Sequence, residues 1–188
     1  MAPEQPVFYY DLGDPECYLV GERVSSELAV VPEWEPILAR RLGLSVPDAE
    51  PAGLRERAAQ QGLQPLRWPP VWPPDTEQAM LAATYAKHIG RAVAYSLAAF
   101  RQAFAGGRDL GDEGTVLIAA AACEMHPTAL LKGMALRSVG AGLARAGERA
   151  REAGVTALPA IAMAGAVFTG RDCLEQANRW LASPVGGR

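Results

Sequence analysis

Cysteine and histidine are scarce in this chain, and their placement excludes several kinds of site. The cysteines are Cys17, Cys123 and Cys173, which are odd in number and far apart. That spacing gives no reason to expect a disulfide framework or a zinc site built on CxxC. With only two histidines in the chain, a histidine-ligated metal enzyme or a Ser-His-Asp triad is not expected either. We expect no bound metal.

The chain also lacks strong net charge, a long apolar run and a phosphate-binding loop. Its formal net charge of −3 gives no reason to expect nucleic acid or a membrane as a partner. No apolar run reaches the roughly 18 residues of a membrane span, and neither GxGxxG nor a P-loop pattern occurs. Residues Met1–Pro6 hold neither a basic region nor an apolar core, so we expect no secretory signal and a cytoplasmic location.

The first organised feature is a strand that runs directly into a helix. Val7–Tyr10 is rich in β-forming residues and predicts a buried strand. Asp14 is a favoured N-cap residue and Pro15 suits the first helical position, so a helix is expected from Pro15 to about Leu28. Cys17 then lies in the first turn of this helix. Because the free amides and the dipole of a helix N-terminus favour negative charge, this junction is a place where chemistry can be sited.

A second strand is expected after this helix. The stretch Val30–Leu38 alternates and carries β-branched and aromatic residues. Its prolines argue for an edge position in the sheet, or for a strand that starts after Pro32. Strand, helix and strand in such a short stretch suggest a βαβ unit with a right-handed crossover.

The region 39–153 contains no further strand signal and predicts helices. We expect their apolar residues at helical spacing to be buried, among them Val93, Leu97, Phe100 and Phe104 on one face of the helix over 91–105, together with the almost wholly apolar run 116–123. The expected helices are a short one over 53–61, one from an Asp75 cap to about Ile89, one over 91–105, one from an Asp112 cap to about Cys123, a short one after His126-Pro127, and one over 136–153.

The segment Leu63–Pro74 is the most unusual in the chain. It holds five prolines and two tryptophans in twelve residues, which forces an extended, stiff path. Two interpretations remain open. The segment is either a loop pinned across the core by its aromatic side chains, or one wall of an apolar ligand cleft to which Trp68 contributes.

The strand signal returns after Gly154. Val155–Met163 and Ala166–Thr169 are short apolar runs joined by a turn with glycine, which predicts a β-hairpin. Gly170-Arg171-Asp172 then opens a last amphipathic helix. The resulting order, β-α-β, helices and β-β-α, is the thioredoxin plan with helices inserted in its middle. We therefore expect one α/β domain over 1–188, with a core formed by 1–38 and 154–182 and an all-helical insertion over 39–153.

Motifs along nearly the whole chain resemble those of one superfamily. They are the entry with Pro15 and Tyr18, Trp34-x-Pro36, the segment Leu66–Pro74, Gly154-Val155-x-x-Leu158-Pro159, and Val167-Phe168-x-Gly170-x-Asp172-x-Leu174. The chain resembles the DsbA-like thioredoxin superfamily and, within it, the 2-hydroxychromene-2-carboxylate isomerase and kappa glutathione-transferase branch.

The resemblance implies three parts of a site. The peptide bond before Pro159 should be cis, which leaves the Leu158 backbone free to pair with a thiol-bearing ligand. Backbone amides near Gly170, Arg171 and Asp172 should hold the γ-glutamyl end of glutathione or a similar low-molecular-weight thiol. The segment from Asp14 to Cys17 occupies the position of the catalytic motif. No tightly bound cofactor is implied, and a homodimer is expected from the resemblance alone.

The catalytic motif departs from that of the relatives. Redox members have Cys-x-x-Cys, whose first cysteine is the nucleophile, whereas this chain has Asp14 there and keeps only Cys17. A dithiol-disulfide cycle within the motif is therefore impossible. Isomerase-branch members use a serine that supports a bound thiolate. An anionic Asp14 would repel that thiolate by about 1 kcal/mol in water and about 4 kcal/mol at an effective dielectric constant of 20, for charges about 4 Å apart.

The roles of three motif residues remain open. Asp14 is either a helix N-cap or a general base that takes a proton from a thiol or an enolisable substrate. Cys17 is either a buried packing residue or a reactive thiol. Tyr18 is either a core aromatic or a residue with its hydroxyl in the cleft.

Two functions are consistent with these residues. The leading hypothesis is a thiol-dependent isomerase, transferase or oxidoreductase acting on a small molecule, with Asp14 and Cys17 in the catalytic motif. The alternative is a binding protein that has lost catalysis and holds a peptide or small molecule at the cis-proline edge. In either case the cleft is expected between the segment from Asp14 to Tyr18, Leu158-Pro159, Trp68 and the Gly170–Asp172 turn.

Overall fold

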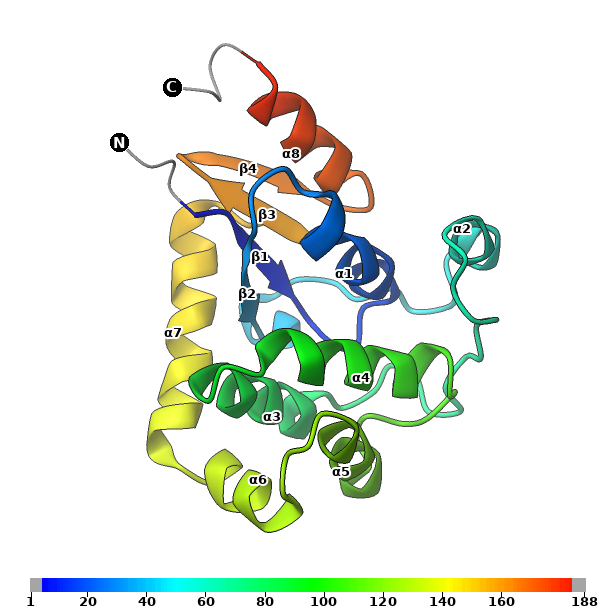
Figure 1. Ribbon diagram of the computed structural model, residues 1–188, viewed down its shortest axis with the longest axis vertical. Helices are drawn as coiled ribbons and strands as arrows, with labels where there is room; N and C mark the ends of the chain where they lie inside the picture. Colours follow the sequence, from blue (N-terminus) through cyan, green and yellow to red (C-terminus); the bar gives the residue numbers. More distant parts are fainter. Residues whose placement is uncertain (1–4, 184–188) are drawn as a thin grey trace.

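The computed structural model describes residues 5–183. Residues 1–4, on which part of the localisation prediction rests, lie outside the described range. The elements in chain order are β1 (Val7–Tyr10), α1 (Pro15–Glu27), β2 (Glu33–Pro36), the 3₁₀ helix η1 (Ala39–Leu42), α2 (Leu54–Gln60), α3 (Glu77–His88), α4 (Ala92–Phe104), α5 (Glu113–Ala122), α6 (Pro127–Met134), α7 (Arg137–Ala153), β3 (Ala160–Met163), β4 (Ala166–Thr169) and α8 (Cys173–Leu181) (Figure 1).

The four strands form one mixed sheet in the order β2-β1-β3-β4. Strand β1 pairs with β2 in parallel and with β3 antiparallel, and β3 pairs with β4 antiparallel. Both alternatives predicted for the second strand hold, because β2 lies at one edge and also begins after Pro32, at Glu33. The hairpin prediction is confirmed with a correction, since its first strand begins only at Ala160.

Helices cover the sheet and extend beyond it. Helix α8 packs against β3 and β4 and contacts α1, while α3 and α7 pack against β2 (Figure 1). Helices α3, α4, α5 and α6 form a layer below the sheet in that view. The predicted class, an α/β thioredoxin-like fold with helices between its two halves, is confirmed; the boundaries of the insertion remain a prediction. No helix among residues 5–183 is long and apolar enough to cross a membrane.

An aromatic cluster joins the sheet to the helical layer. The ring of Trp34 meets those of Phe8 and Tyr10 edge to face, at centroid distances of 5.0 and 5.3 Å. The Tyr10 ring also lies 6.0 Å from that of Phe100 on α4. The buried hydroxyl of Tyr10 bonds to that of Ser96, with 2.6 Å between the oxygens. Burial of these side chains is the main force that holds the two layers together.

The buried faces of α4 and α5 agree only in part with those expected. Val93 is 37% exposed, and Ile118, within the predicted buried run, is 41% exposed. Phe100 and Phe104 are buried as predicted, and Tyr95, Ser96, Ala99 and Ala103 complete the buried face of α4. Small residues on that face let α4 pack closely on its neighbours, and a pattern read from the large apolar residues alone misses their share of it.

Helix caps agree with the sequence in two cases and differ in a third. Asp14 and Asp112 are N-caps whose side chains accept amide hydrogen bonds, as predicted. The N-cap of α3 is Thr76 rather than Asp75. The Asp75 carboxylate still accepts a hydrogen bond from the Glu77 amide at 3.1 Å, so it satisfies one free amide of the first turn from one position earlier.

Candidate functional site

Asp14 lies at the N-terminus of α1 and is almost completely buried. Its backbone is extended, and its Oδ1 accepts hydrogen bonds from the amides of Glu16 at 2.8 Å and Cys17 at 3.3 Å. Only 2% of the residue is exposed. Oδ2 accepts no hydrogen bond from any residue in the described part of the chain. Oδ2 is therefore the atom of this carboxyl that is free to carry a proton.

Burial sets the proton affinity of Asp14. Loss of solvent raises the pKa of Asp14 to about 7, against the lowering effect of the two amide hydrogen bonds. The nearby charges of Asp11 and Glu16 raise it further. Asp14 consequently changes its protonation state close to neutral pH, as a general base or acid must.

Cys17 is enclosed behind Asp14. It is fully buried, and burial together with the charge of Asp14 raises the pKa of its thiol well above the usual range. A protonated, inaccessible thiol is a poor nucleophile. Cys173, at the start of α8, is also fully buried, and burial raises its pKa to about 12. These features favour the packing role for both cysteines, while the catalytic role of Cys17 remains a prediction.

The Leu158–Pro159 peptide bond is cis, as expected. Strand pairing between β1 and β3 ends at Tyr9 and Ala160, so Pro159 lies where β1 gives way to the loop that leads to Asp14. Leu158 is 7% exposed. The fold thus brings the end of β1, the motif and the cis-proline to one edge of the sheet.

The Gly170–Asp172 turn is tied to the cis-proline. The Gly170 amide donates to the Pro159 carbonyl at 2.8 Å. The prediction that this amide is available to a ligand therefore needs correction, and only the amides of Arg171 and Asp172 remain as candidates. Asp172 occupies the N-cap of α8, but its side chain makes no capping hydrogen bond. The Arg171 side chain is 63% exposed and lies 3.7 Å from the Asp172 carboxylate.

A cavity of about 550 Å³ lies between α1, α2 and α8. It joins Glu16 of the motif to Arg171 and Asp172, and Arg57 of α2 closes it. Arg57 Nη1 donates to Glu16 Oε2 at 2.6 Å, and its second nitrogen pairs with the other oxygen. The charged lining residues are Glu16, Arg23, Glu27, Arg57, Arg171, Asp172 and Glu175. With three cations and four anions, the cavity suits a ligand that carries both signs of charge.

A second cavity, of about 450 Å³, lies beside Gly13, which directly precedes Asp14. Asp11, Arg40 and Thr76 contribute polar groups to its wall, and Pro73 and Pro74 contribute apolar surface. The motif thus contributes Glu16 to one cavity, and the residue before the motif, Gly13, lines the other. Asp14 itself lines neither.

Comparison with known proteins agrees with the fold. A family model described as the DSBA-like thioredoxin domain matches residues 7–182. The chain belongs to the DSBA-like thioredoxin family. A search of curated protein sequences gave no match.

Solved structures with the same fold include an isomerase and two oxidoreductases. A 2-hydroxychromene-2-carboxylate isomerase aligns with a TM-score of 0.79 at 16% identity, over 94% of each chain. A probable DsbA oxidoreductase from Streptomyces coelicolor aligns with a TM-score of 0.77 at 19% identity, over 98% of this chain and 91% of that one. The cytosolic disulfide reductase DsbM from Pseudomonas aeruginosa, solved with GSH, aligns with a TM-score of 0.66 at 15% identity, over 95% and 97%.

Two residues predicted to bind ligand lie elsewhere in this DsbA-like domain. Tyr18 is 1% exposed, and its ring stacks on that of Phe104 at 5.5 Å. Half-buried Trp68 packs against Trp72, with ring centroids 4.2 Å apart, and faces Phe104 at 6.3 Å. Neither residue lines the two cavities beside the motif. The structure therefore favours the core role for Tyr18. It favours the pinned-loop interpretation for the part of the Leu63–Pro74 segment around Trp68. Pro73 and Pro74, at the end of that segment, line the cavity beside Gly13.

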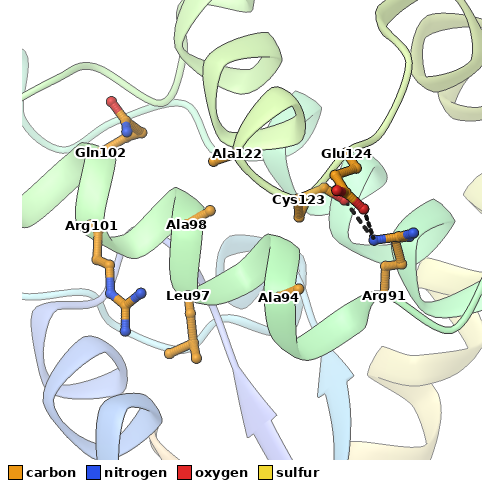
Figure 2. A pocket seen from close by; sticks show the side chains of 9 residues that line it. All are labelled: Arg91, Ala94, Leu97, Ala98, Arg101, Gln102, Ala122, Cys123 and Glu124. Atoms are coloured by element: carbon orange, nitrogen blue, oxygen red, sulfur yellow. Dashed lines mark hydrogen bonds and ion pairs between the residues drawn. The ribbon is translucent and has the colours of Figure 1, made fainter.

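A third cavity, of about 510 Å³, lies between α4 and α5 and holds none of the predicted ligand-binding residues (Figure 2). Ala94, Leu97 and Ala98 of α4 and Ala122 of α5 are among its lining residues, and Arg91 and Arg101 lie toward opposite ends of α4. Arg91 Nη1 donates to the Cys123 carbonyl at 2.8 Å and lies 3.8 Å from the Glu124 carboxylate. None of its lining residues belongs to the motif, the cis-proline or the Gly170–Asp172 turn.

Sequence reasoning missed Asp11, Arg57 and the second cis peptide bond, Trp72–Pro73. Asp11 stands directly between the first strand and the motif, and that position was a usable signal. The cis Trp72–Pro73 bond lies in the run of prolines already singled out. Nothing in the sequence marks Arg57 among the charges of α2, because its significance comes from the approach of α2 to α1.

Proposed function

We propose that this DsbA-like protein is a thiol-dependent isomerase or transferase for a small molecule, in which Asp14 moves the proton. The observation that carries the proposal is the state of the motif. Cys17 is sealed off with a raised pKa, whereas burial gives the carboxyl of Asp14 a pKa of about 7. Asp14 is therefore the group of the motif best suited to exchange a proton near neutral pH.

This role removes the electrostatic objection to an aspartate in that position. A low-molecular-weight thiol has a pKa of about 8.5, so transfer of its proton to Asp14 is uphill by about 1.5 pH units, and the hydrogen bond that the neutral carboxyl then donates to the thiolate offsets this gap. The carboxylate becomes neutral as the thiolate forms, and one negative charge is present before and after the step. The two like charges that would repel each other never coexist. The proton returns when the thiol is released.

The cavity between α1, α2 and α8 is the proposed thiol site. Glutathione carries an ammonium group and two carboxylates, and the mixed charges around Arg57 and Arg171 complement them. The Oε1 atom of Gln61, which also lines this cavity, is buried without a hydrogen-bond partner, so it can accept from a ligand N–H. DsbM, a protein of the same fold, was solved with GSH, which supports the choice of thiol.

Calorimetric titration with reduced glutathione tests the proposal. We expect binding at millimolar concentration or tighter. Arg57→Ala and Arg171→Ala should each weaken it roughly tenfold, equivalent to about 1.4 kcal/mol. Arg145→Ala, at an exposed position of α7 outside the cavity, is the matched control and should bind as the wild type does. Absence of heat with glutathione, cysteine and coenzyme A at millimolar concentration would reject the thiol-enzyme function.

A second function, a binding protein without catalysis, is favoured by one observation. Asp14 lines neither cavity beside the motif, and its Oδ1 is committed to two capping hydrogen bonds. In that case the Leu158 edge would hold a peptide or small molecule and Asp14 would only cap α1. Ligand binding that is unchanged in Asp14→Asn would favour this alternative. Cytoplasmic location and a homodimer also remain proposals.

A further inference from the structure

Asp11 is a second buried carboxyl, three residues before Asp14. Only 2% of it is exposed. Its Oδ1 accepts from the Gly13 amide and its Oδ2 from the Ala39 amide, each at 2.9 Å. The Asp14 amide in turn donates to the Asp11 carbonyl at 3.1 Å. The two aspartates are thus held rigidly on one tight loop.

Neither carboxyl forms an ion pair with a cation in the described part of the chain, although the charge of Arg40 lowers the pKa of Asp11 against the larger effect of burial. Within residues 5–183, no lysine, arginine or histidine nitrogen forms an ion pair with Asp11 or Asp14. Arg40 lines the same cavity as Asp11, but its guanidinium is held by Asp75 at 2.7 Å and by Glu77. Two carboxyls that share a buried loop without an ion-paired cation cannot both ionise at low cost, because each anion disfavours the other.

Asp11 also has the access that Asp14 lacks. It lines the cavity of about 450 Å³ beside Gly13, with proline on one wall and Ser45 and Thr76 nearby. A molecule in that cavity would lie beside Asp11 but not beside Asp14. Other titratable or charged groups near the two carboxyls, from each element packed around them, are Tyr10, Glu16, Cys17, Arg40, Asp48 and Asp75.

We propose that Asp11 is a second acid–base group of the site, which shares one exchangeable proton with Asp14 near neutral pH and faces the substrate in the cavity beside Gly13. The proposal rests on the proposed function only in assigning proton exchange to Asp14. A proton taken from the substrate enters the carboxyl pair and is returned to the product, so the pair is unchanged after each cycle. Burial raises the pKa of Asp11 above the usual aspartate range, in agreement with this assignment.

A purely structural role for Asp11 predicts a different behaviour. Its bonds to the Gly13 and Ala39 amides tie the motif loop to η1, and an aspartate that only did this would titrate independently of Asp14. A shared proton instead gives two macroscopic steps that belong to the pair, and removal of one carboxyl must alter the titration of the other.

Carboxyl ¹³C NMR of aspartate-labelled full-length protein, titrated without thiol or substrate, distinguishes a shared proton from a purely structural role of Asp11. In the wild type we expect the pair to titrate in two steps more than about one pH unit apart, the upper one near neutral pH. In Asp11→Asn, the Asp14 signal should titrate at least about one pH unit lower than that upper step. In Asp14→Asn, which keeps an N-cap, the Asp11 signal should likewise titrate at a lower pH. This reciprocal variant decides the question if Asp11→Asn does not fold.

Asp109→Asn is the matched control, because Asp109 makes the same kind of turn with the Gly111 amide at 2.8 Å. It should leave the titration of Asp14 unchanged. Two carboxyls that titrate independently, or both below about pH 5, would overturn the proposal. That outcome would leave thiol binding untouched, whereas failure of glutathione to bind would leave the titration unaffected.

Discussion

Asp14 and Asp112 have the same local role but opposite electrostatic surroundings. Each is an N-cap whose carboxylate accepts amide hydrogen bonds. At exposed Asp112 these bonds lower the pKa of the carboxyl, whereas at Asp14 loss of solvent outweighs them and raises the pKa to about 7. Depth of burial, rather than the capping motif, therefore decides whether the aspartate is a permanent anion or a proton carrier.

The pH dependence of stability follows from this difference. A carboxyl whose pKa is raised on folding binds its proton more tightly in the folded state, so its contribution is complete below about pH 4 and is lost as the pH rises through about 7. At about 1.4 kcal/mol for each tenfold change in proton affinity, the loss is of the order of 4 kcal/mol. Urea unfolding of wild type and Asp14→Asn between these pH values should show that the variant gains stability relative to the wild type as the pH rises.

Asp112→Asn is the control for that series. Because the pKa of Asp112 is lowered on folding, its contribution is present above the unfolded pKa and lost as the pH falls. The relative stability of Asp112→Asn should therefore change in the opposite direction. A stability difference between wild type and Asp14→Asn that stays constant with pH would contradict the raised pKa of Asp14.

The buried thiols give a second prediction at the residue scale. Cys17 and Cys173 are fully buried, and burial raises the pKa of both, so neither should react with iodoacetamide in the folded protein at neutral pH. Peptide mass spectrometry of alkylated protein measures this directly. All three cysteines should become labelled in concentrated guanidinium. Rapid labelling of Cys17 in the folded state would instead restore it as a nucleophile.

The sequence located the motif but left its chemistry open. Asp14 as a cap and Cys17 as a first-turn residue follow from local rules that need no tertiary information. The pKa values of these two residues depend on how completely other elements cover the start of α1. Local sequence does not determine the burial of single side chains, so these pKa values could not be predicted from it. The exposed Val93 and the buried Tyr18 show the same limit.

At the scale of elements, two glycines within helices differ in what surrounds them. A Cβ added at Gly133 of α6 would lie 2.3 Å from the ring of Tyr85 on α3, whereas one added at Gly140 of α7 meets no atom within 4 Å. Gly133 therefore lets α6 approach α3 closely. At Gly140 no packing contact of this kind requires a glycine.

Alanine substitution separates these two cases. Gly133→Ala should destabilise the protein by about 1–3 kcal/mol through overpacking, despite the better helix propensity of alanine. Gly140→Ala should stabilise it by up to about 1 kcal/mol. Both values come from urea unfolding at one pH. Equal effects of the two substitutions would mean that α6 and α3 do not pack as described.

Element order and type were readable because each signal was local. Strands β1, β3 and β4, and the caps at Asp14 and Asp112, were marked by composition and by favoured N-cap residues. The face that α4 buries was readable only in part, since Phe100 and Phe104 marked it but alanine and serine carry little pattern. Closure of the cavity by α2 depends on distant segments for the same reason.

At the scale of the whole molecule, the site is assembled from segments far apart in the sequence. The β1–α1 loop, the cis-proline before β3, the start of α8 and the helix α2 each contribute to it. The ion pair between Arg57 and Glu16, 25% and 15% exposed at their side chains, links α2 to the motif helix. It fixes the wall of the proposed thiol cavity.

A double-mutant cycle measures that link. Glu16→Gln and Arg57→Gln should couple by about 1 kcal/mol, the upper end for a partly exposed pair, because both guanidinium nitrogens bond the carboxylate. The pair of Arg55 and Glu50, equally two-pronged but more exposed, is the comparison and should couple more weakly. Coupling that is no stronger for the Arg57 pair would show that α2 is not anchored to the motif.

The central claim is that Asp14 takes the proton of a bound thiol. Ultraviolet difference absorbance of the thiolate, recorded as glutathione is added near neutral pH, tests it most directly. S-methylglutathione, which cannot ionise at sulfur, is the control ligand. We predict a thiolate band with wild-type protein and its loss in Asp14→Asn, which retains the cap but cannot take a proton. An equal band in both proteins, or bound glutathione with no band in the wild type, would contradict the claim.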